Sequence, residues 1–165
     1  MINSKNLNQN VFTISCFTDY LNLECGIAKN CPGYHFDYKI IDFYLGGMGI
    51  IKVSKVYAPW QKYQVAFEKI KHFNIELIDT QIGKDNMDVQ MTVDMIDTLY
   101  KHPEIDIFAV ISGDIDFLPA IQKIKQDKYN KVILISEENS LNRKYYGIVD
   151  IVVPYQRLMS IYKFL

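Results

Sequence analysis

Four aspartates stand where the predicted secondary structure changes. Asp19 ends a β-rich run, Asp114 and Asp116 directly follow the apolar run FAVIS, and Asp88 lies near the start of a segment with helical period. Two carboxylates about 5 Å apart repel by about 3 kcal/mol at an effective dielectric constant of about 20. All-oxygen ligation of this kind suits Mg²⁺ or Mn²⁺. If the fold brings these side chains together, the chemistry that they predict is metal-dependent hydrolysis of a phosphodiester.

The elements that must position these acids alternate between β-rich and helical segments, which predicts an α/β fold with a mainly parallel sheet covered by helices. The predicted strands are Val11–Thr18, Ile50–Tyr57, Ile75–Ile78, Ile105–Ser112, Lys131–Ser136 and Ile148–Val153. The predicted helices are Tyr38–Leu45, Gln61–Lys71, Met87–Tyr100, Phe117–Lys125, Asn139–Tyr146 and Tyr155–Phe164. FAVIS is nearly continuous in apolar residues, so we expect its strand to be central.

The position of the acids relative to the strands favours a shared site. In an open α/β sheet, ligands bind outside the carboxyl ends of the strands, where the strand order reverses. If the first and fourth strands are neighbours there, Asp19, Asp114 and Asp116 converge on one crevice, and Asp88 enters from the adjacent loop. Each acid also has a structural alternative: Asp116 as a helix N-cap and Asp88 as a favourable first-turn charge.

Composition limits the classes of function. The chain has 165 residues and a net charge of -1, which excludes a broadly polycationic nucleic-acid coat. We expect a flexible segment over residues 1–10 and a single domain over residues 11–165. No stretch approaches the roughly 20 apolar residues that span a bilayer, so we expect a soluble, cytoplasmic protein without a membrane partner. A homodimer stays open.

Other site chemistries find less support in the sequence. Cys25, Cys31 and His35 could be drawn as zinc ligands, but no fourth ligand has finger-like spacing. Three cysteines in all favour free thiols in a reducing compartment. Neither GxGxxG nor GxxxxGK[ST] occurs, so dinucleotide and P-loop nucleotide binding lack their usual motifs.

Three stretches resemble, in order, the motif blocks of the NYN domain, a PIN-like nuclease family that includes the LabA-like bacterial proteins. They are DYLNL (Asp19–Leu23), KDNMDVQMTVDM (Lys84–Met95) and SGDIDFLP (Ser112–Pro119). The resemblance extends from about Val11 to Tyr155. It implies a three-layer α/β/α PIN-like fold and a ribonuclease that depends on Mg²⁺ or Mn²⁺ and acts on single-stranded or structured RNA.

Carried onto this chain, the resemblance implies that Asp19, Asp88, Asp114 and Asp116 are the metal-binding and catalytic acids. Further candidates would support these acids or contact the substrate. They are Asn22, Lys84, Asp94, Ser112, Gly113 and Arg143. Lys144 would add positive charge, and Tyr145 and Tyr146 would offer stacking faces for bases.

Three rival functions remain at this stage. One is a non-catalytic RNA-binding or regulatory module with the same fold. A second is a haloacid-dehalogenase-like phosphatase, suggested by DID (Asp114–Asp116), although that family's nucleophile lies on its first strand. A third is a protein-interaction domain, because Met87, Met91 and Met95 recur at helical spacing, a pattern that more often belongs to the core.

Overall fold

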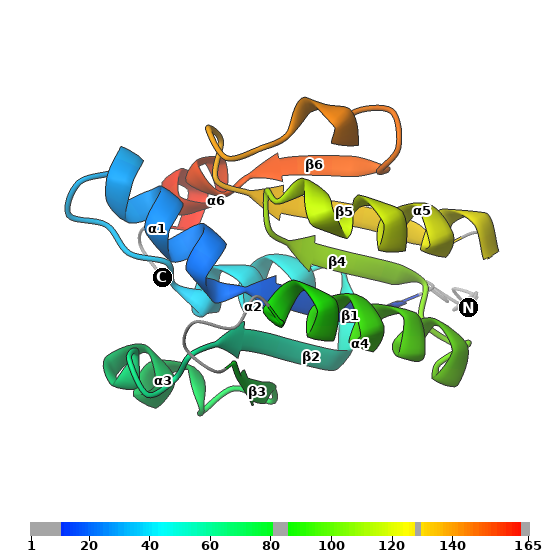
Figure 1. Ribbon diagram of the computed structural model, residues 1–165, viewed down its shortest axis with the longest axis horizontal. Helices are drawn as coiled ribbons and strands as arrows, with labels where there is room; N and C mark the ends of the chain where they lie inside the picture. The colour runs from blue at the N-terminus through cyan, green and yellow to red at the C-terminus, as the bar shows by residue number, and fades with distance from the viewer. Residues whose placement is uncertain (1–10, 81–85, 128–129, 163–165) are drawn as a thin grey trace, which may run out of the picture.

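Six apolar segments form one parallel sheet in the computed structural model, which describes residues 11–80, 86–127 and 130–162. The strands run in the order β3-β2-β1-β4-β5-β6, and every neighbouring pair is parallel. Their bounds are β1 Phe12–Asp19, β2 Gly49–Ala58, β3 Glu76–Asp79, β4 Ile107–Ile111, β5 Lys131–Ser136 and β6 Ile151–Pro154. Figure 1 shows the strands pointing toward the side where helices α1 and α3 lie. The segment 1–10, predicted to be flexible, lies outside the described residues.

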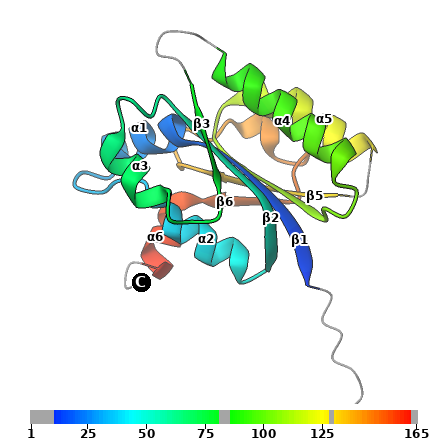
Figure 2. The ribbon, with the colours of Figure 1, turned by 90° about the horizontal axis from the view of Figure 1, so that it is seen from below.

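Helices cover both faces of this sheet and make the three-layer α/β/α fold that the sequence predicts. Helices α4 and α5 lie over one face and α2 and α6 over the other, with α1 and α3 toward the carboxyl ends of the strands (Figure 2). Their bounds are α1 Tyr20–Asn30, α2 Tyr38–Gly46, α3 Gln64–Ile70, α4 Met87–Lys101, α5 Leu118–Asp127 and α6 Tyr155–Tyr162. In the described residues, no helix is both long and apolar enough to cross a membrane.

Two apolar clusters, one on each face, hold the layers together. Successive side chains of a strand point to opposite faces, so Cys16 of β1 joins the cluster beneath α2 and α6 while Phe17 joins the cluster beneath α4 and α5. Met91 and Met95 of α4 are fully buried in the second cluster. The interpretation of the methionine stripe as core is therefore confirmed.

Two helix predictions need correction. The helix predicted over Asn139–Tyr146 is wrong, because this segment contains turns and only a short 3-10 helix, η2 (Arg143–Tyr145). The Asn142 side chain accepts a hydrogen bond from Lys144 N, and this local bond competes with a regular helix. Conversely, α1 was absent from the predicted helices. It starts directly at the end of β1, with Asp19 as its N-cap.

The strand order places a topological switch point between β1 and β4. The chain runs from β1 outward to β2 and β3, and then returns through α4 to β4 on the other side of β1. The first and fourth strands are neighbours, as convergence of the acids requires, with parallel pairing from Ile14 with Ile107 to Thr18 with Ile111. The carboxyl ends of β1 and β4 therefore meet where open α/β sheets bind ligands.

Gly49 begins β2 at a point where two backbones meet. A Cβ atom added to Gly49 would lie 2.0 Å from the carbonyl oxygen of Phe12 in β1, whereas one added to Gly46 would meet nothing within 4 Å.

We expect Gly49→Ala to destabilise the protein by about 1–3 kcal/mol or more through overpacking. Gly46→Ala, at the end of α2, should be neutral or stabilising by up to about 1 kcal/mol. Urea denaturation of both variants checks this pair, and equal stabilities would contradict the described register.

Candidate metal centre

The fold brings three of the four predicted acids into one carboxylate cluster. Asp88 lies in the first turn of α4, and Asp114 and Asp116 follow β4 around the short 3-10 helix η1 (Ile115–Phe117). One carboxylate oxygen from each lies within 4.8 Å of the other two. Asp88 and Asp114 are half-buried and Asp116 is exposed, so the cluster is open to solvent on one side.

Asp19 lies beside this cluster rather than within the triad. It ends β1 and is buried, with 3% of its surface exposed. Burial, and to a lesser extent the nearby charges of Asp88 and Asp114, raise the pKa of Asp19 to about 7 against the opposing effect of its hydrogen bonds. The smaller part of this shift, from Asp88 and Asp114, is the repulsion that the sequence predicts for acids gathered without a cation.

Hydrogen bonds hold the two acid-bearing loops together. The Asn22 side-chain oxygen accepts from Gly113 N at 2.9 Å, and Asn22 N donates to Asp19 Oδ1 at 3.0 Å. Ser112 Oγ donates to Asp19 Oδ2 at 3.3 Å and accepts from Asp114 N at 3.2 Å. The predicted supporting residues Asn22 and Ser112 thus join the end of β1 to the end of β4.

Gly113 is required by the packing behind it. An added Cβ would lie 2.5 Å from the carbonyl oxygen of Ser140 and 2.6 Å from Ser136 Oγ. The position that a Cβ would occupy at Gly113 is therefore taken up by the end of β5 and the segment after it. Asp114 is fixed next to this contact, since its Oδ1 accepts from Asp116 N at 3.1 Å.

Two supporting residues escaped the sequence interpretation. Glu137, directly after β5, is fully buried, and it accepts hydrogen bonds from Ser140 N at 2.8 Å, Ser140 Oγ at 2.9 Å and Asn139 N at 3.0 Å. It thereby fixes the Ser140 segment on which Gly113 packs. Tyr145, considered as a stacking face, is instead buried and donates its hydroxyl hydrogen bond to the Asp114 carbonyl. The position of Glu137 at a strand's carboxyl end was the available signal.

Three predicted site residues remain, namely Asp94, Arg143 and Lys84. Asp94 is buried on α4 and contacts β2: Tyr57 Oη donates a hydrogen bond to it at 2.6 Å, and Lys55 Nζ forms an ion pair with it at 3.4 Å. It does not belong to the triad. Arg143 is exposed on η2, the element anchored to the Asp114 loop through Tyr145. Lys84 lies outside the described residues.

The zinc alternative gains no support where the structure describes the chain. Cys25, Cys31 and His35 do not form a group of potential ligands there, and His35 Nδ1 instead pairs with Glu24 Oε1 at 2.6 Å. All three cysteines are free.

The donors of the carboxylate cluster fit a hard divalent cation. Opposite ligands of an octahedral Mg²⁺ lie about 4 Å apart, because each bond is about 2.0–2.1 Å long. Of three ligands on one octahedral ion, at least two pairs are neighbours only about 3 Å apart, so oxygens within 4.8 Å of one another must move inward to share an ion. The donors are all oxygens, which favours Mg²⁺ or Mn²⁺ over zinc. Asp88, Asp114 and Asp116 would hold the ion, with Asp19 beside them.

Low pH should weaken the hydrogen bonds by which Glu137 fixes the Ser140 segment. Burial raises the pKa of Glu137, but its hydrogen bonds outweigh burial and hold the pKa below the ordinary 4.5. A lowered pKa stabilises the fold above the ordinary value, and this contribution is lost as the pH falls through the folded pKa. We expect Glu137→Gln to cost about 1–3 kcal/mol at neutral pH, with a smaller cost at pH 4. Urea denaturation measures this, with exposed Glu138→Gln as control. A cost independent of pH would contradict the charged state of Glu137.

A divalent cation should stabilise the folded chain through the carboxylate cluster. At tenfold excess over its Kd, a bound ion contributes about 1.4 kcal/mol, which raises the Tm by about 3–5 °C. We expect Mn²⁺ to produce this increase in the native protein and EDTA to reverse it. Asp114→Asn should abolish it, whereas Asp97→Asn on the exposed face of α4 should not. Thermal unfolding with and without Mn²⁺ checks this, and equal shifts in both variants would place the ion elsewhere.

Comparison with known proteins agrees with this fold and shows the family. The family model described as the NYN domain matches residues 14–150. The uncharacterized protein MJ0482 of Methanocaldococcus jannaschii is 30% identical over 120 residues, which are 73% of this chain and 48% of that protein, so the chain spans about half the length of this curated relative. The crystal structure of a protein of unknown function, VPA0982 from Vibrio parahaemolyticus, matches with a TM-score of 0.70 at 20% identity, covering 90% of this chain and 96% of that one. The chain belongs to the NYN domain family, within the PIN-like nuclease superfamily.

Proposed function

We propose that this protein is a ribonuclease, a hydrolase acting on ester bonds, that cleaves RNA phosphodiesters with Mg²⁺ or Mn²⁺. The observation that carries the proposal is the carboxylate triad Asp88, Asp114 and Asp116 at the switch point of the sheet, with Asp19 beside it. Membership of the NYN family supports the same chemistry, because its superfamily consists of nucleases.

The carboxylates and the residues around them have separate roles in the proposed reaction. A divalent cation held here would neutralise charge on the phosphodiester and polarise a water for attack. Asp88, Asp114 and Asp116 would hold that ion through their carboxylate oxygens. Asp19 contributes negative charge from the buried side of the site, where Ser112 and the α1 backbone fix its orientation. The open side of the cluster, at Asp116, leaves room for a strand to approach.

Positive charge for the RNA backbone is available next to the cluster. Arg143 and Lys144 are exposed on η2. The next residue, Tyr145, is buried and ties this element to the Asp114 carbonyl. Tyr146 is 60% exposed and offers the stacking face that Tyr145 does not. We propose that this segment contacts the RNA beside the cleaved bond.

Cleavage of labelled single-stranded and structured RNA with Mn²⁺ tests the proposal. Asp114→Asn keeps an oxygen that can accept from Asp116 N, so the loop geometry should survive while the ligand charge is lost. We expect the native chain to cleave, EDTA to stop cleavage, and Asp114→Asn to lower the rate by about 100-fold or more. Asp97→Asn, which removes an exposed charge on α4 outside the cluster, should cleave like the native chain.

Two results would contradict the ribonuclease proposal in different ways. Equal cleavage by the native chain and by Asp114→Asn would mean that the activity does not come from this site. RNA binding without any cleavage, at every Mn²⁺ concentration tested, would favour a non-catalytic RNA-binding module on the same fold.

A further inference from the structure

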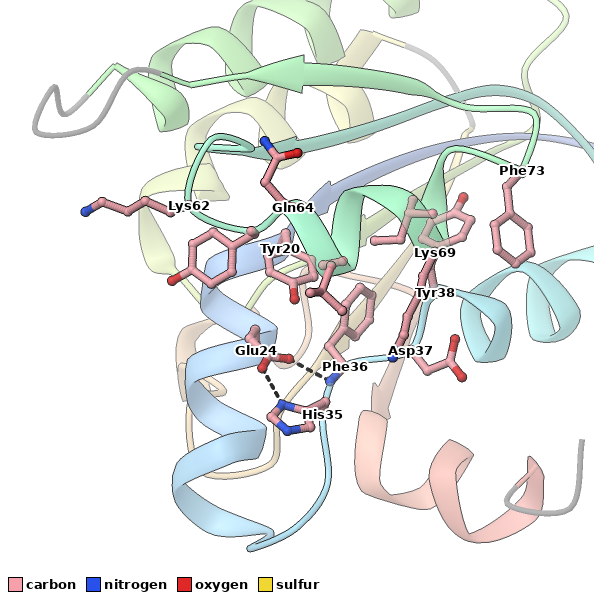
Figure 3. A pocket seen from close by; sticks show the side chains of 14 residues that line it. Tyr20, Glu24, His35, Phe36, Asp37, Tyr38, Lys62, Gln64, Lys69 and Phe73 are labelled. Atoms are coloured by element: carbon pink, nitrogen blue, oxygen red, sulfur yellow. Dashed lines mark hydrogen bonds and ion pairs between the residues drawn. The ribbon is translucent and has the colours of Figure 1, made fainter.

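A pocket of about 580 Å³ lies outside the carboxylate cluster. Its walls come from α1, the segment between α1 and α2, and α3 (Figure 3). This volume lies within the range of small-molecule sites, about 300–1,000 Å³. Neither the acids of the cluster nor the residues of η2 line the pocket, so the proposed hydrolysis does not use it.

Aromatic rings form much of the wall. Tyr20 lies at its centre, with ring centroids 5.4 Å from Tyr63 and 5.8 Å from Phe36, and both contacts are edge-to-face. Trp60 packs behind Tyr20 at 5.5 Å and is 4% exposed. Tyr63 and Phe73 are the half-buried rings of the wall, and Tyr63, beside Tyr20, is the one that we assign to a stacked partner. Such walls bind flat, π-rich groups, and nucleobases of any sequence can stack on them.

Two lysines at the pocket have no ionic partner among the described residues. Lys62 precedes α3 and Lys69 lies on it, and both are exposed lining residues that form no ion pair there. Most other lysines of the described ranges are paired with an acid; these are Lys52, Lys55, Lys71, Lys101, Lys123 and Lys125. The α3 side of the pocket therefore offers positive charge to an anion.

The acids of the pocket lie on its opposite side and are already engaged. Glu24 accepts from Phe36 N at 2.8 Å and pairs with His35, contacts that Figure 3 draws at the foot of the pocket. Asp37 accepts from Lys39 N at 3.0 Å. These bonds fix the segment between α1 and α2. The negative charge of Glu24 and Asp37 repels an anion on their side of the pocket. An anion therefore belongs on the α3 side, and a flat ring between the aromatic walls.

The pocket and the carboxylate cluster meet at the end of β1. Asp19, beside the cluster, and Tyr20, at the centre of the pocket, are consecutive residues. Their surroundings lie on opposite sides of the sheet's carboxyl edge, because Tyr20 packs with the apolar cluster beneath α2 and α6, whereas α4 carries Asp88 on the other face. The two sites are thus linked through consecutive residues at one edge of the sheet.

We propose that this pocket binds one nucleotide of a single-stranded RNA substrate, with its base against Tyr63 and its phosphates on Lys62 and Lys69. The inference rests on the proposed ribonuclease function and adds the preference for an unpaired strand. A base inside a duplex presents no free face to Tyr63, so the nucleotide in the pocket must be unstacked. The pocket sets where the strand lies relative to the carboxylates, and the chemistry stays with the cluster.

Binding without cleavage isolates the pocket. In an Asp114→Asn background with EDTA present, fluorescence anisotropy of labelled oligouridylate and oligoadenylate measures affinity for single strands. We expect Tyr63→Ala to weaken binding about tenfold and Tyr63→Phe, which keeps the ring, to bind normally. Tyr63 makes no side-chain cap to α3, so helix capping is unchanged in both variants. Tyr34→Ala, at an exposed ring outside the pocket, is the aromatic control.

The lysines give a second signature that a purely structural role would not alter. Each phosphate contact on a single strand contributes about 0.7 to the slope of log affinity against log salt concentration. Lys62→Ala and Lys69→Ala should each lower the slope by that amount. Lys29→Ala, which removes an exposed charge on α1 outside the pocket, should leave it unchanged. Trp60, the only tryptophan, should change its emission when the oligonucleotide binds.

The outcomes separate this inference from the ribonuclease proposal. Unchanged affinity and salt slope in the Tyr63 and lysine variants would overturn the pocket assignment, even if Asp114→Asn abolishes cleavage. Equal weakening by the Lys29 and Tyr34 controls would also overturn it. Weakened binding in the pocket variants alone would support it, including in a protein that proves unable to cleave RNA.

Discussion

The gathering of carboxylates at the ends of β1 and β4 is the constraint on which the rest of the site depends. The sheet order brings Asp19 and Asp114 to adjacent strand ends, and the return through α4 adds Asp88. Burial then raises the pKa of Asp19 to about 7, the value of a group held where its charge is poorly solvated. A fold gains no stability from such a cluster by itself. A divalent cation would turn the repulsion between these carboxylates into affinity, which is why the cluster supports the proposed metal-dependent chemistry.

Much of the surrounding structure resists that repulsion. Asn22 joins the two acid-bearing loops through Gly113 N, and the Ser112 hydroxyl bridges Asp19 and Asp114 N. Behind them, Glu137 holds the Ser140 segment against Gly113. A buried carboxylate is costly unless hydrogen-bond donors satisfy its oxygens. Glu137 accepts from several donors, so this side of the site is firmly fixed. The aromatic pocket lies across the sheet edge and depends on a different set of contacts.

The sequence predicts the parts of this molecule that arise from local pattern. All six predicted strands are present, and the parallel order places Asp19 beside the end of β4 as expected. The failures occur where tertiary contacts decide the conformation. The Asn139–Tyr146 segment looks helical by spacing, yet the Asn142 cap and the bonds to Glu137 hold it in turns. The aromatic pocket was equally invisible, because its walls come from α1 and α3, which meet only in the folded chain.

Anomalous scattering from crystals soaked in Mn²⁺ tests the metal centre most directly, because it locates the ion without relying on activity. The account predicts a strong peak bounded by carboxylate oxygens of Asp88, Asp114 and Asp116, with Asp19 beside it. The same soak of Asp114→Asn should lose the peak. A peak that appears only at other acids, or no peak at these oxygens under saturating Mn²⁺, would contradict the assignment of this cluster as the cation site.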